Sequence, residues 1–482
     1  MSQKNKMLQK FNGLSKRKRS IVLLSAALAV VLVLTAVLAL TAPEEAPNTQ
    51  PATTYLFNIK RTDIRQVKVK NEAFVLTATL QEDGTYALEQ MKDVEVSSTS
   101  IVYLLMDVAM IDDSKVANEA PESLSDYGLD KPASTVIITM KDGSTHTLKI
   151  GNATAFNDGY FVMADDDPAV YIADKSLSDT CLQGPTYYIS NTILPTMEET
   201  QAAMMTNIRI YEKDVKDVKF VKKTEAQQEA DKLNSYNTHI MTSHPGYNPS
   251  TDMMSRLAQN ISGLTATSVV HYAPTASQLK ACGLDAPQYI VEYELNGASY
   301  KVKFGNKLND TDIYAMRDGM NAVFAVTLST DLEYCLDSPL INYVERLLYM
   351  RNIANVNKLT LTVGGRDHAY EFLFDQSGED PVITYNGTTM ILQDFRRFYT
   401  SVIGTLLQNY AEKPENANKL LEVRFDNDDG NTVTVVYYEL EARKAFVTIN
   451  GVGEFYVLRD DVETIISNLD KVIRGEEVPR GY

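Results

Sequence analysis

The sequence predicts an α+β protein built from tandem modules of antiparallel sheet with covering helices, preceded by one transmembrane helix. Three observations predict it. Short motifs recur in order, the segments around them alternate between strand and helix periodicity, and one long apolar run lies near the N-terminus. The expected parts are a cytoplasmic tail, a membrane span, a Pro-rich stalk and three modules, at residues 1–19, 20–42, 43–54, 55–200, 201–350 and 351–482.

The N-terminal segment has the composition of a membrane anchor. Seven Lys or Arg residues and no acid occupy residues 1–19, and residues 21–42 carry no charge. A helix of that length spans about 33 Å, enough to cross a hydrocarbon core of about 30 Å. The alternative, a cleaved signal peptide, usually has an apolar region of only about 7–15 residues. The basic tail is expected in the cytoplasm and the bulk of the chain outside, in a single-pass protein of the cell membrane.

The charge of the chain excludes one class of partner. The 46 basic and 63 acidic residues give a net charge of −17, and the tail holds seven of the basic ones and none of the acids. The remainder therefore has 39 basic and 63 acidic residues, a net charge of −24. Such a domain is repelled by nucleic acid, so no nucleic acid is expected as a partner.

Cysteine and proline usage fit an extracytoplasmic chain on a stalk. The three cysteines, Cys181, Cys282 and Cys335, lie far apart, and we expect them to be small buried hydrophobes rather than a disulfide framework. Residues 41–54 contain three prolines and no large apolar side chain, which is typical of a flexible stalk.

Internal repetition defines the modules. Four motifs of the first module recur in the same order 151–155 residues later: 63–69 at 214–220, 127–132 at 282–287, 150–152 at 304–306, and 169–171 at 322–324. A third, diverged copy begins near Asn355. It keeps a hairpin signal at Asp429-Gly430 and a late aromatic strand at 455–457, but it lacks the Gly-Leu-Asp-x-Pro motif of the other two.

Periodicity predicts the elements of the first module. Helical spacing of Ile101, Leu104, Leu105 and Val108 predicts a helix over 98–110, capped by a serine between 97 and 100. A short helix is expected at 174–182. Alternating or apolar runs predict strands at 64–69, 74–80, 86–88, 135–140, 145–150, 160–163 and 169–172.

Turn residues make more specific predictions. Asp142-Gly143, Asn296-Gly297 and Asp429-Gly430 should form equivalent hairpins with tight primed turns, which need positive φ. In the Gly-Leu-Asp-x-Pro motif we expect a structural role rather than a binding role. Its glycines should adopt a left-handed turn, its leucines should be buried and its prolines should occupy the first position of a strand: Gly128 and Gly283, Leu129 and Leu284, Pro132 and Pro287.

The second module carries extra residues at 223–250, which are polar and rich in turn formers. We expect an exposed loop there, and long loops often carry binding surfaces.

A search for chemistry gives no site. The sequence has no HExxH, GxSxG, Walker A or dinucleotide-binding glycine motif. Residues 277–280 match SxxK without its companion motifs, and residues 426–431 fail the calcium-loop pattern because Gly430 falls where a ligand is required. A two-ligand metal site at His239 and His244 is the remaining alternative. We therefore assign no catalytic, cofactor-binding or metal-binding residues and expect no cofactor.

The series of motifs resembles a known family. Tyr-Gly-Leu-Asp-x-Pro, a Val-rich strand, Asp-Gly, Leu-x-Ile-Gly, and the Tyr-Phe-Val and Val-Tyr strands are similar to the bacterial family called domain of unknown function 4340. The resemblance implies anchored extracytoplasmic proteins, often encoded beside ABC-transporter components of the gliding-motility type. It implies no catalytic residues.

The resulting hypothesis is a non-catalytic scaffold or accessory protein that partners a transporter permease or another envelope component. The alternative is an envelope hydrolase with a carboxylate pair that the sequence does not identify. A scaffold needs an exposed apolar or aromatic patch, whereas an enzyme needs a cleft with convergent polar groups.

Overall fold

The computed structural model describes residues 54–57, 59–113, 115–230 and 237–480. The expected cytoplasmic tail and membrane span lie outside these residues, as does almost all of the stalk. No helix within the described ranges is both long and apolar enough to cross a membrane. The chain divides into two compact units, residues 1–56 with 112–114 and the remainder. In the smaller unit, Tyr55 forms an antiparallel bridge with Asp112.

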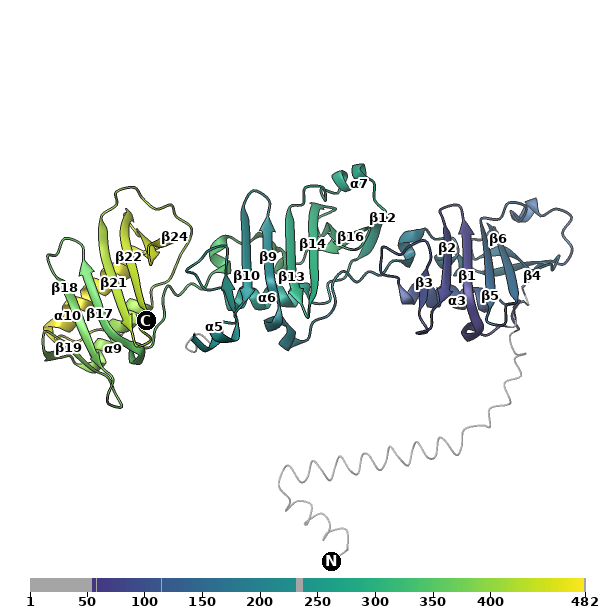
Figure 1. Ribbon diagram of the computed structural model, residues 1–482. Helices are drawn as coiled ribbons and strands as arrows, with labels where there is room; N and C mark the ends of the chain where they lie inside the picture. Colours follow the sequence, from purple (N-terminus) through teal and green to yellow (C-terminus); the bar gives the residue numbers. More distant parts are fainter. Residues whose placement is uncertain (1–53, 58, 114, 231–236, 481–482) are drawn as a thin grey trace, which may run out of the picture. The chain divides into compact units, whose positions relative to one another are not determined.

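The larger unit contains three eight-stranded antiparallel sheets (Figure 1). We call each sheet with its helices a module. The first sheet has the order β3-β2-β1-β5-β6-β7-β8-β4. Its strands are β1 (Ile64–Asn71), β2 (Val75–Leu80), β3 (Tyr86–Leu88), β4 (Val116–Asn118), β5 (Ser134–Met140), β6 (Thr145–Ala153), β7 (Gly159–Ala164) and β8 (Val170–Asp174). Module 1 also contains η1 (Arg61–Asp63), α3 (Ser98–Ala109), η2 (Ser125–Tyr127), α4 (Leu177–Thr180) and η3 (Pro185–Tyr188).

The second sheet repeats this order as β11-β10-β9-β13-β14-β15-β16-β12. Its strands are β9 (Thr206–Glu212), β10 (Lys216–Lys222), β11 (His239–Met241), β12 (Ser268–Tyr272), β13 (Tyr289–Leu295), β14 (Ala298–Lys307), β15 (Asp312–Arg317) and β16 (Ala322–Thr327). Its helices are η4 (Glu199–Met204), α5 (Glu225–Ala230), α6 (Thr251–Ile261), α7 (Ala276–Ala281), α8 (Thr330–Asp337) and η6 (Leu340–Tyr343).

The third sheet has the order β20-β19-β18-β17-β21-β22-β23-β24. Its strands are β17 (Val356–Val363), β18 (Ala369–Asp375), β19 (Val382–Tyr385), β20 (Thr388–Thr389), β21 (Lys419–Asn427), β22 (Thr432–Glu441), β23 (Lys444–Ile449) and β24 (Val452–Leu458). Its helices are η7 (Ile353–Asn355), α9 (Leu392–Ile403) and α10 (Arg459–Arg474). Tandem modules of antiparallel sheet with helices are thus confirmed.

Strand pairing decides which strands of the modules correspond. β1, β9 and β17 each pair with the next strand on one side and, on the other, with the first strand of the later hairpin. The predicted match of 63–69 with 214–220 is therefore wrong, because it joins β1 to β10, whose counterpart is β2. The error has a physical cause: half-buried strands of one sheet share the same alternation of apolar and polar residues.

The predicted helix of module 1 is confirmed. Ser97 caps α3 by accepting a hydrogen bond from the Ser100 backbone N–H. The four residues at helical spacing are all buried: Ile101, Leu104, Leu105 and Val108. The burial patterns align α3 with α6 and α9, so that Leu105 corresponds to Ala258 and Tyr399.

The three predicted hairpins occupy equivalent positions, but only one has a primed turn. Asn296 and Gly297 have φ of 52° and 80° and alone join β13 to β14. In the other two hairpins only the glycine has positive φ, 91° at Gly143 and 80° at Gly430. Four residues separate the strands there, so a wider turn ending in a left-handed glycine replaces the predicted primed turn.

The Gly-Leu-Asp-x-Pro motif has the predicted backbone. Gly128 and Gly283 have φ of 69° and 70°, and their neighbouring leucines are buried. The prolines do not begin strands, since β5 starts at Ser134 and β13 at Tyr289, two residues later. Outside the sheet the missing proline N–H costs no ladder hydrogen bond.

Two recurring motifs are halves of one contact. A Cβ added to Gly128 would overlap the Asn152 side chain, and one added to Gly151 would overlap the Tyr127 carbonyl oxygen. Module 2 repeats the arrangement between Gly283 and Asn306, whose backbone N–H donates to the Cys282 carbonyl at 2.8 Å. Gly-Leu-Asp and Gly-Asn therefore recur together because each glycine makes room for the other motif.

The stretch at 223–250 is only partly the exposed loop that its polarity predicts. Residues 239–241 form β11, which pairs with β10 at the edge of the sheet as β3 pairs with β2. His239 and Asn237 are buried. The prediction fails at β11 because polar side chains there find hydrogen-bond partners inside the module, which offset the cost of burial.

Candidate functional site

The outer face of α3 is apolar and uncovered. Val102, Tyr103 and Met106 are 39%, 53% and 36% exposed, and Met110 just after the helix is 51% exposed. The helix contains one charged residue, Asp107. We call Val102, Tyr103, Met106 and Met110 the α3 face.

The counterpart helices present polar residues at the same positions. α6 has Ser255, Arg256 and Gln259 where α3 has Val102, Tyr103 and Met106. α9 has Arg396, Arg397 and Thr400 there. In α6 these three side chains are exposed, and in α9 the Arg397 guanidinium donates to the Val478 carbonyl at 2.7 Å. Two copies of the helix thus have polar side chains at these positions, and one copy has apolar side chains. An apolar exposed face that its homologous helices lack indicates a surface for a partner.

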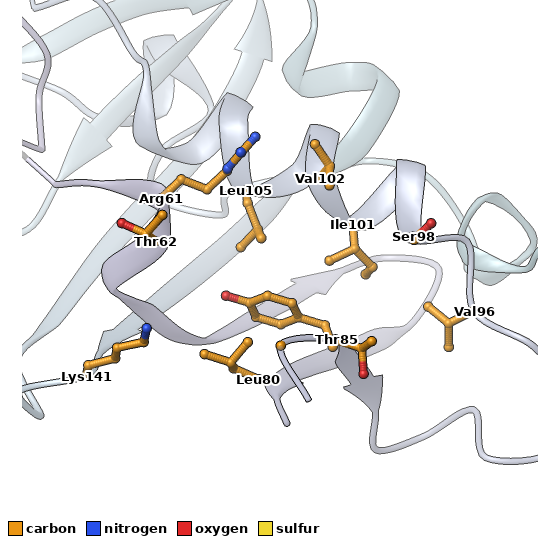
Figure 2. Close-up of a pocket in the computed structure, with 12 residues that line it drawn as sticks. Arg61, Thr62, Leu80, Thr85, Val96, Ser98, Ile101, Val102, Leu105 and Lys141 are labelled. Carbon is orange, nitrogen blue, oxygen red and sulfur yellow. The ribbon is translucent and has the colours of Figure 1, made fainter. Parts of the chain in front are cut away.

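A cavity of about 660 Å³ lies in module 1 between α3 and the hairpin of β2 and β3. Figure 2 shows Leu80, Ile101 and Leu105 in its middle, with Arg61 and Lys141 toward one end. The volume is in the range of small-molecule sites, which are commonly about 300–1,000 Å³. The cavity has mostly apolar walls, and no carboxylate or histidine lines it.

Asp107 links α3 to α4. Its carboxylate accepts a hydrogen bond of 2.8 Å from the Thr180 hydroxyl. Burial raises the pKa of Asp107 above its ordinary value, the Thr180 and Ser176 hydroxyls lower it, and the charges of Asp174 and Asp179 raise it further. The net shift is upward, so the folded state holds this carboxylate in its charged form at a cost.

We predict that Asp107→Asn raises the melting temperature of the protein by a few degrees at neutral pH. A raised folded pKa means that the folded chain binds more protons than the unfolded chain between the two pKa values, so the free energy of unfolding falls as the pH rises through that window. The amide keeps an acceptor for Thr180 and removes the charge. The gain should shrink as the pH falls and vanish below the unfolded pKa, where Asp107 is protonated in both states. Thermal melts at pH 4 and pH 7 measure it, and an equal gain at both would contradict the pKa argument.

The residues singled out from sequence do not assemble a catalytic or metal centre. His239 has both ring nitrogens occupied, by the Thr238 hydroxyl at 2.9 Å and the Met205 carbonyl at 2.8 Å. His244 Nδ1 lies 2.9 Å from the Ser243 hydroxyl. Across the described ranges, no three His, Cys, Asp or Glu side chains are grouped to hold a metal ion.

The other weak patterns are structural. The SxxK segment lies in α7, where Thr275 and Gln278 form a capping box. In the acidic turn of module 3, Asp428 accepts a hydrogen bond of 2.6 Å from Arg351. Of the carboxylates in the described chain, Glu212 alone is fully buried, and it is paired with Lys216.

The three cysteines are free and buried, as predicted. Burial raises the pKa of the Cys335 thiol to about 11 and that of the Cys181 thiol to about 12. Thiols held neutral and out of solvent are poor nucleophiles, so these residues act as core packing.

Comparison with known proteins settles the family. The family model for Domain of unknown function (DUF4340) matches residues 88–287 and 240–382, which together cover more than half of the chain. The protein belongs to the DUF4340 family. Both DUF4340 matches begin in the third strand of a module, β3 or β11, and run into the next module. No curated protein and no solved structure matches the chain.

Sequence reasoning missed the α3 face, although a signal was present. Of the three equivalent helices, α3 alone has apolar residues, Val102, Tyr103 and Met106, outside its inward stripe. A helix that is apolar all round is ordinarily expected in a core. In this DUF4340 protein the outer half of that helix is exposed instead.

Proposed function

We propose that this DUF4340 protein is a non-catalytic accessory protein, anchored in the membrane by residues 20–42, that binds an envelope partner through the α3 face. The partner is a transporter permease or another protein of the cell envelope. Repeated modules fit a scaffold, because each one adds a rigid sheet without requiring a reaction centre of its own.

The observation that carries the proposal is the exposure of Tyr103 and Met106 where the equivalent helices have arginine, glutamine or threonine. Aromatic residues and methionine are enriched in protein interfaces, and charged residues are depleted from interface cores. A helix face of this kind fits an apolar groove or another helix on the partner.

The length of the stalk favours a partner at the membrane. Residues 43–54 extend to at most about 43 Å, at roughly 3.3–3.6 Å per residue. Module 1 follows the stalk directly, so an anchored chain would hold α3 within reach of the outer surface of a neighbouring membrane protein.

The anchoring is tested by protease accessibility. We expect protease added to intact protoplasts to remove the modules and to leave the short basic tail protected, because Lys and Arg hold that tail in the cytoplasm. Immunoblotting with tags at each terminus reports the fragments. A full-length chain protected from the protease, or a mature N-terminus near Pro43, would refute the anchored topology.

The binding role is tested by chemical crosslinking in intact cells followed by capture of the full chain. We expect one envelope protein to be crosslinked through module 1, at positions on or beside α3. Crosslinks that concentrate on α6 or α9 instead would refute the assignment of the interface.

A further inference from the structure

The cavity of module 1 combines an apolar interior with two cations at one end. We propose that this cavity binds an anionic amphiphile, an alkyl chain that ends in a carboxylate or a phosphate. Val102 belongs both to the α3 face and to the cavity lining, whereas Tyr103, Met106 and Met110 do not line the cavity. The inference therefore does not rest on the partner-binding role.

The walls suit an alkyl chain. Ile101 and Leu105 of α3 face Leu80 of β2 across the cavity, with Val96 toward its other end (Figure 2). An alkyl chain needs no hydrogen bonds, so burying it against such walls gains about 25 cal/mol per Å² without leaving a polar group unsatisfied. The hydroxyl groups of the lining belong to Thr62, Thr85, Ser98 and Tyr86, and the Tyr86 hydroxyl already donates to the Ile64 carbonyl.

The cations are available for an anion. In the part of the chain that the structure describes, neither Arg61 nor Lys141 forms an ion pair. Both side chains line the same cavity, in a chain whose net charge beyond the tail is −24. Arginine and lysine are the side chains that bind carboxylate and phosphate most strongly.

Tyr86 is a fixed part of the cavity wall, which Arg61 also lines. Its hydroxyl donates to the Ile64 carbonyl at 2.7 Å, which fixes the ring in the cavity wall. Burial raises the pKa of Tyr86, and the positive charge of Arg61 counters that shift in part. Arg61 and Tyr86 thus line the same cavity, and the charge of Arg61 acts on a group in its wall.

In module 3, two phenylalanine side chains fill the space that is equivalent to the module 1 cavity. β1 and β17 have the same bulge near their first residues, so Ile64 corresponds to Val356. The pairing of β1 with β2 and of β17 with β18 then aligns Leu80 with Phe374. The helix alignment places Phe395 at the position of Ile101. The rings of Phe374 and Phe395 pack edge to face, with centroids 5.6 Å apart. Smaller side chains at both positions open the space in module 1.

The charge at the end of the cavity is also reversed between the modules. The Lys141 backbone N–H donates to the Asp63 carbonyl at 2.8 Å, and the Asp428 N–H donates to the Asn355 carbonyl at 3.1 Å. Lys141 therefore corresponds to Asp428, whose carboxylate is paired with Arg351. Unlike module 3, the described part of module 1 combines the open space with an unpaired cation at this position, which is the combination that an anionic amphiphile requires.

The test uses the full chain in nanodiscs with two photoreactive probes, a diazirine-bearing palmitate and a diazirine-bearing phosphatidylglycerol. After irradiation, mass spectrometry of peptides locates the label. We expect label within residues 80–86 and 96–105, which contain the apolar lining. Label from palmitate alone assigns a free fatty acid, and label from phosphatidylglycerol alone assigns a membrane lipid; either result supports the shared chemistry.

Two double variants make the result specific. Leu80→Phe/Ile101→Phe introduces the module 3 residues, and Arg61→Gln/Lys141→Gln removes both charges. Each should lower the label on these segments about tenfold, the change expected when a close contact of this strength is lost. Lys70→Gln/Lys131→Gln is the matched control, because it makes the same charge change at exposed residues outside the cavity and should leave the label unchanged.

Folding is checked separately by thermal melts of all three variants. The charge variant alters exposed residues and should melt as the wild type does, so it remains informative if the phenylalanine variant is unstable. Absence of label on residues 80–86 and 96–105 with both probes would overturn the proposal. Label that persists undiminished in the charge variant would overturn it as well.

Discussion

Gly128→Val and Gly283→Val should each destabilise their own module strongly. Both glycines have left-handed backbones, which cost a β-branched residue about 1–3 kcal/mol. An added Cβ would also overlap the side chain of Asn152 or Asn306, and overpacking of this kind costs about another 1–3 kcal/mol. Hydrogen exchange of the full chain, followed by mass spectrometry, measures the loss module by module.

Gly143→Val is the matched control for that prediction. Gly143 has φ of 91°, but nothing lies within 4 Å of the position where its Cβ would be. It should therefore show the backbone cost without the overlap and destabilise module 1 less than Gly128→Val does. Equal losses at the two positions would show that the contact between the recurring motifs contributes nothing. A binding role for the motif would instead leave exchange unchanged and abolish capture of the partner.

Tyr103→Arg/Met106→Gln should abolish capture of the envelope partner without lowering the stability of the protein. The variant gives α3 the residues that α6 carries at the same positions, so the helix remains capped and its buried face is unchanged. Loss of an interface anchor commonly costs about 2 kcal/mol or more, which corresponds to a decrease in affinity of about 30-fold. Titration of the captured partner against the full chain in nanodiscs measures the change.

The equivalent helix supplies the control. Arg256→Ala/Gln259→Ala alters exposed residues of α6 at the positions of Tyr103 and Met106. It should leave affinity unchanged and lower the melting temperature only slightly, because the contacts of Arg256 with Asp252, Asp331 and the Tyr334 ring are exposed. Equal losses of affinity in the two variants would contradict a specific role for the α3 face.

The α3 face and the cavity use mostly different residues of the same helix. Ile101 and Leu105 serve the cavity, whereas Tyr103 and Met106 point to the outer surface. Variants of Ile101 or Leu105 can therefore be tested for capture of the partner, and variants of Tyr103 or Met106 can be tested for labelling of the cavity. Independence of the two readouts would show two sites on α3, and joint loss would show that occupancy of the cavity controls the presentation of the outer face.

The sequence predicted the features that depend on local physics. Helical spacing located α3 and its buried residues, and alternation located most strands of module 1, with β3 at its observed bounds. Glycine predicted the left-handed turns at Gly128 and Gly283, because only glycine adopts that backbone without strain. The short edge strand β4 was missed, since three residues carry too little periodicity to stand out.

Only the tertiary structure decided which residues meet and which face solvent. Alternation is alike in β1 and β10, so pairing alone showed that β9, not β10, corresponds to β1. The contact of Gly128 with Asn152 joins motifs that are separate in sequence. Tyr103 is exposed because no element in the described ranges covers that side of α3. The cavity depends on Leu80 and Ile101, which lie opposite each other where module 3 has two phenylalanine rings. Sequence periodicity tells which side of an element is apolar, but only the packing of the whole module shows whether that side is covered.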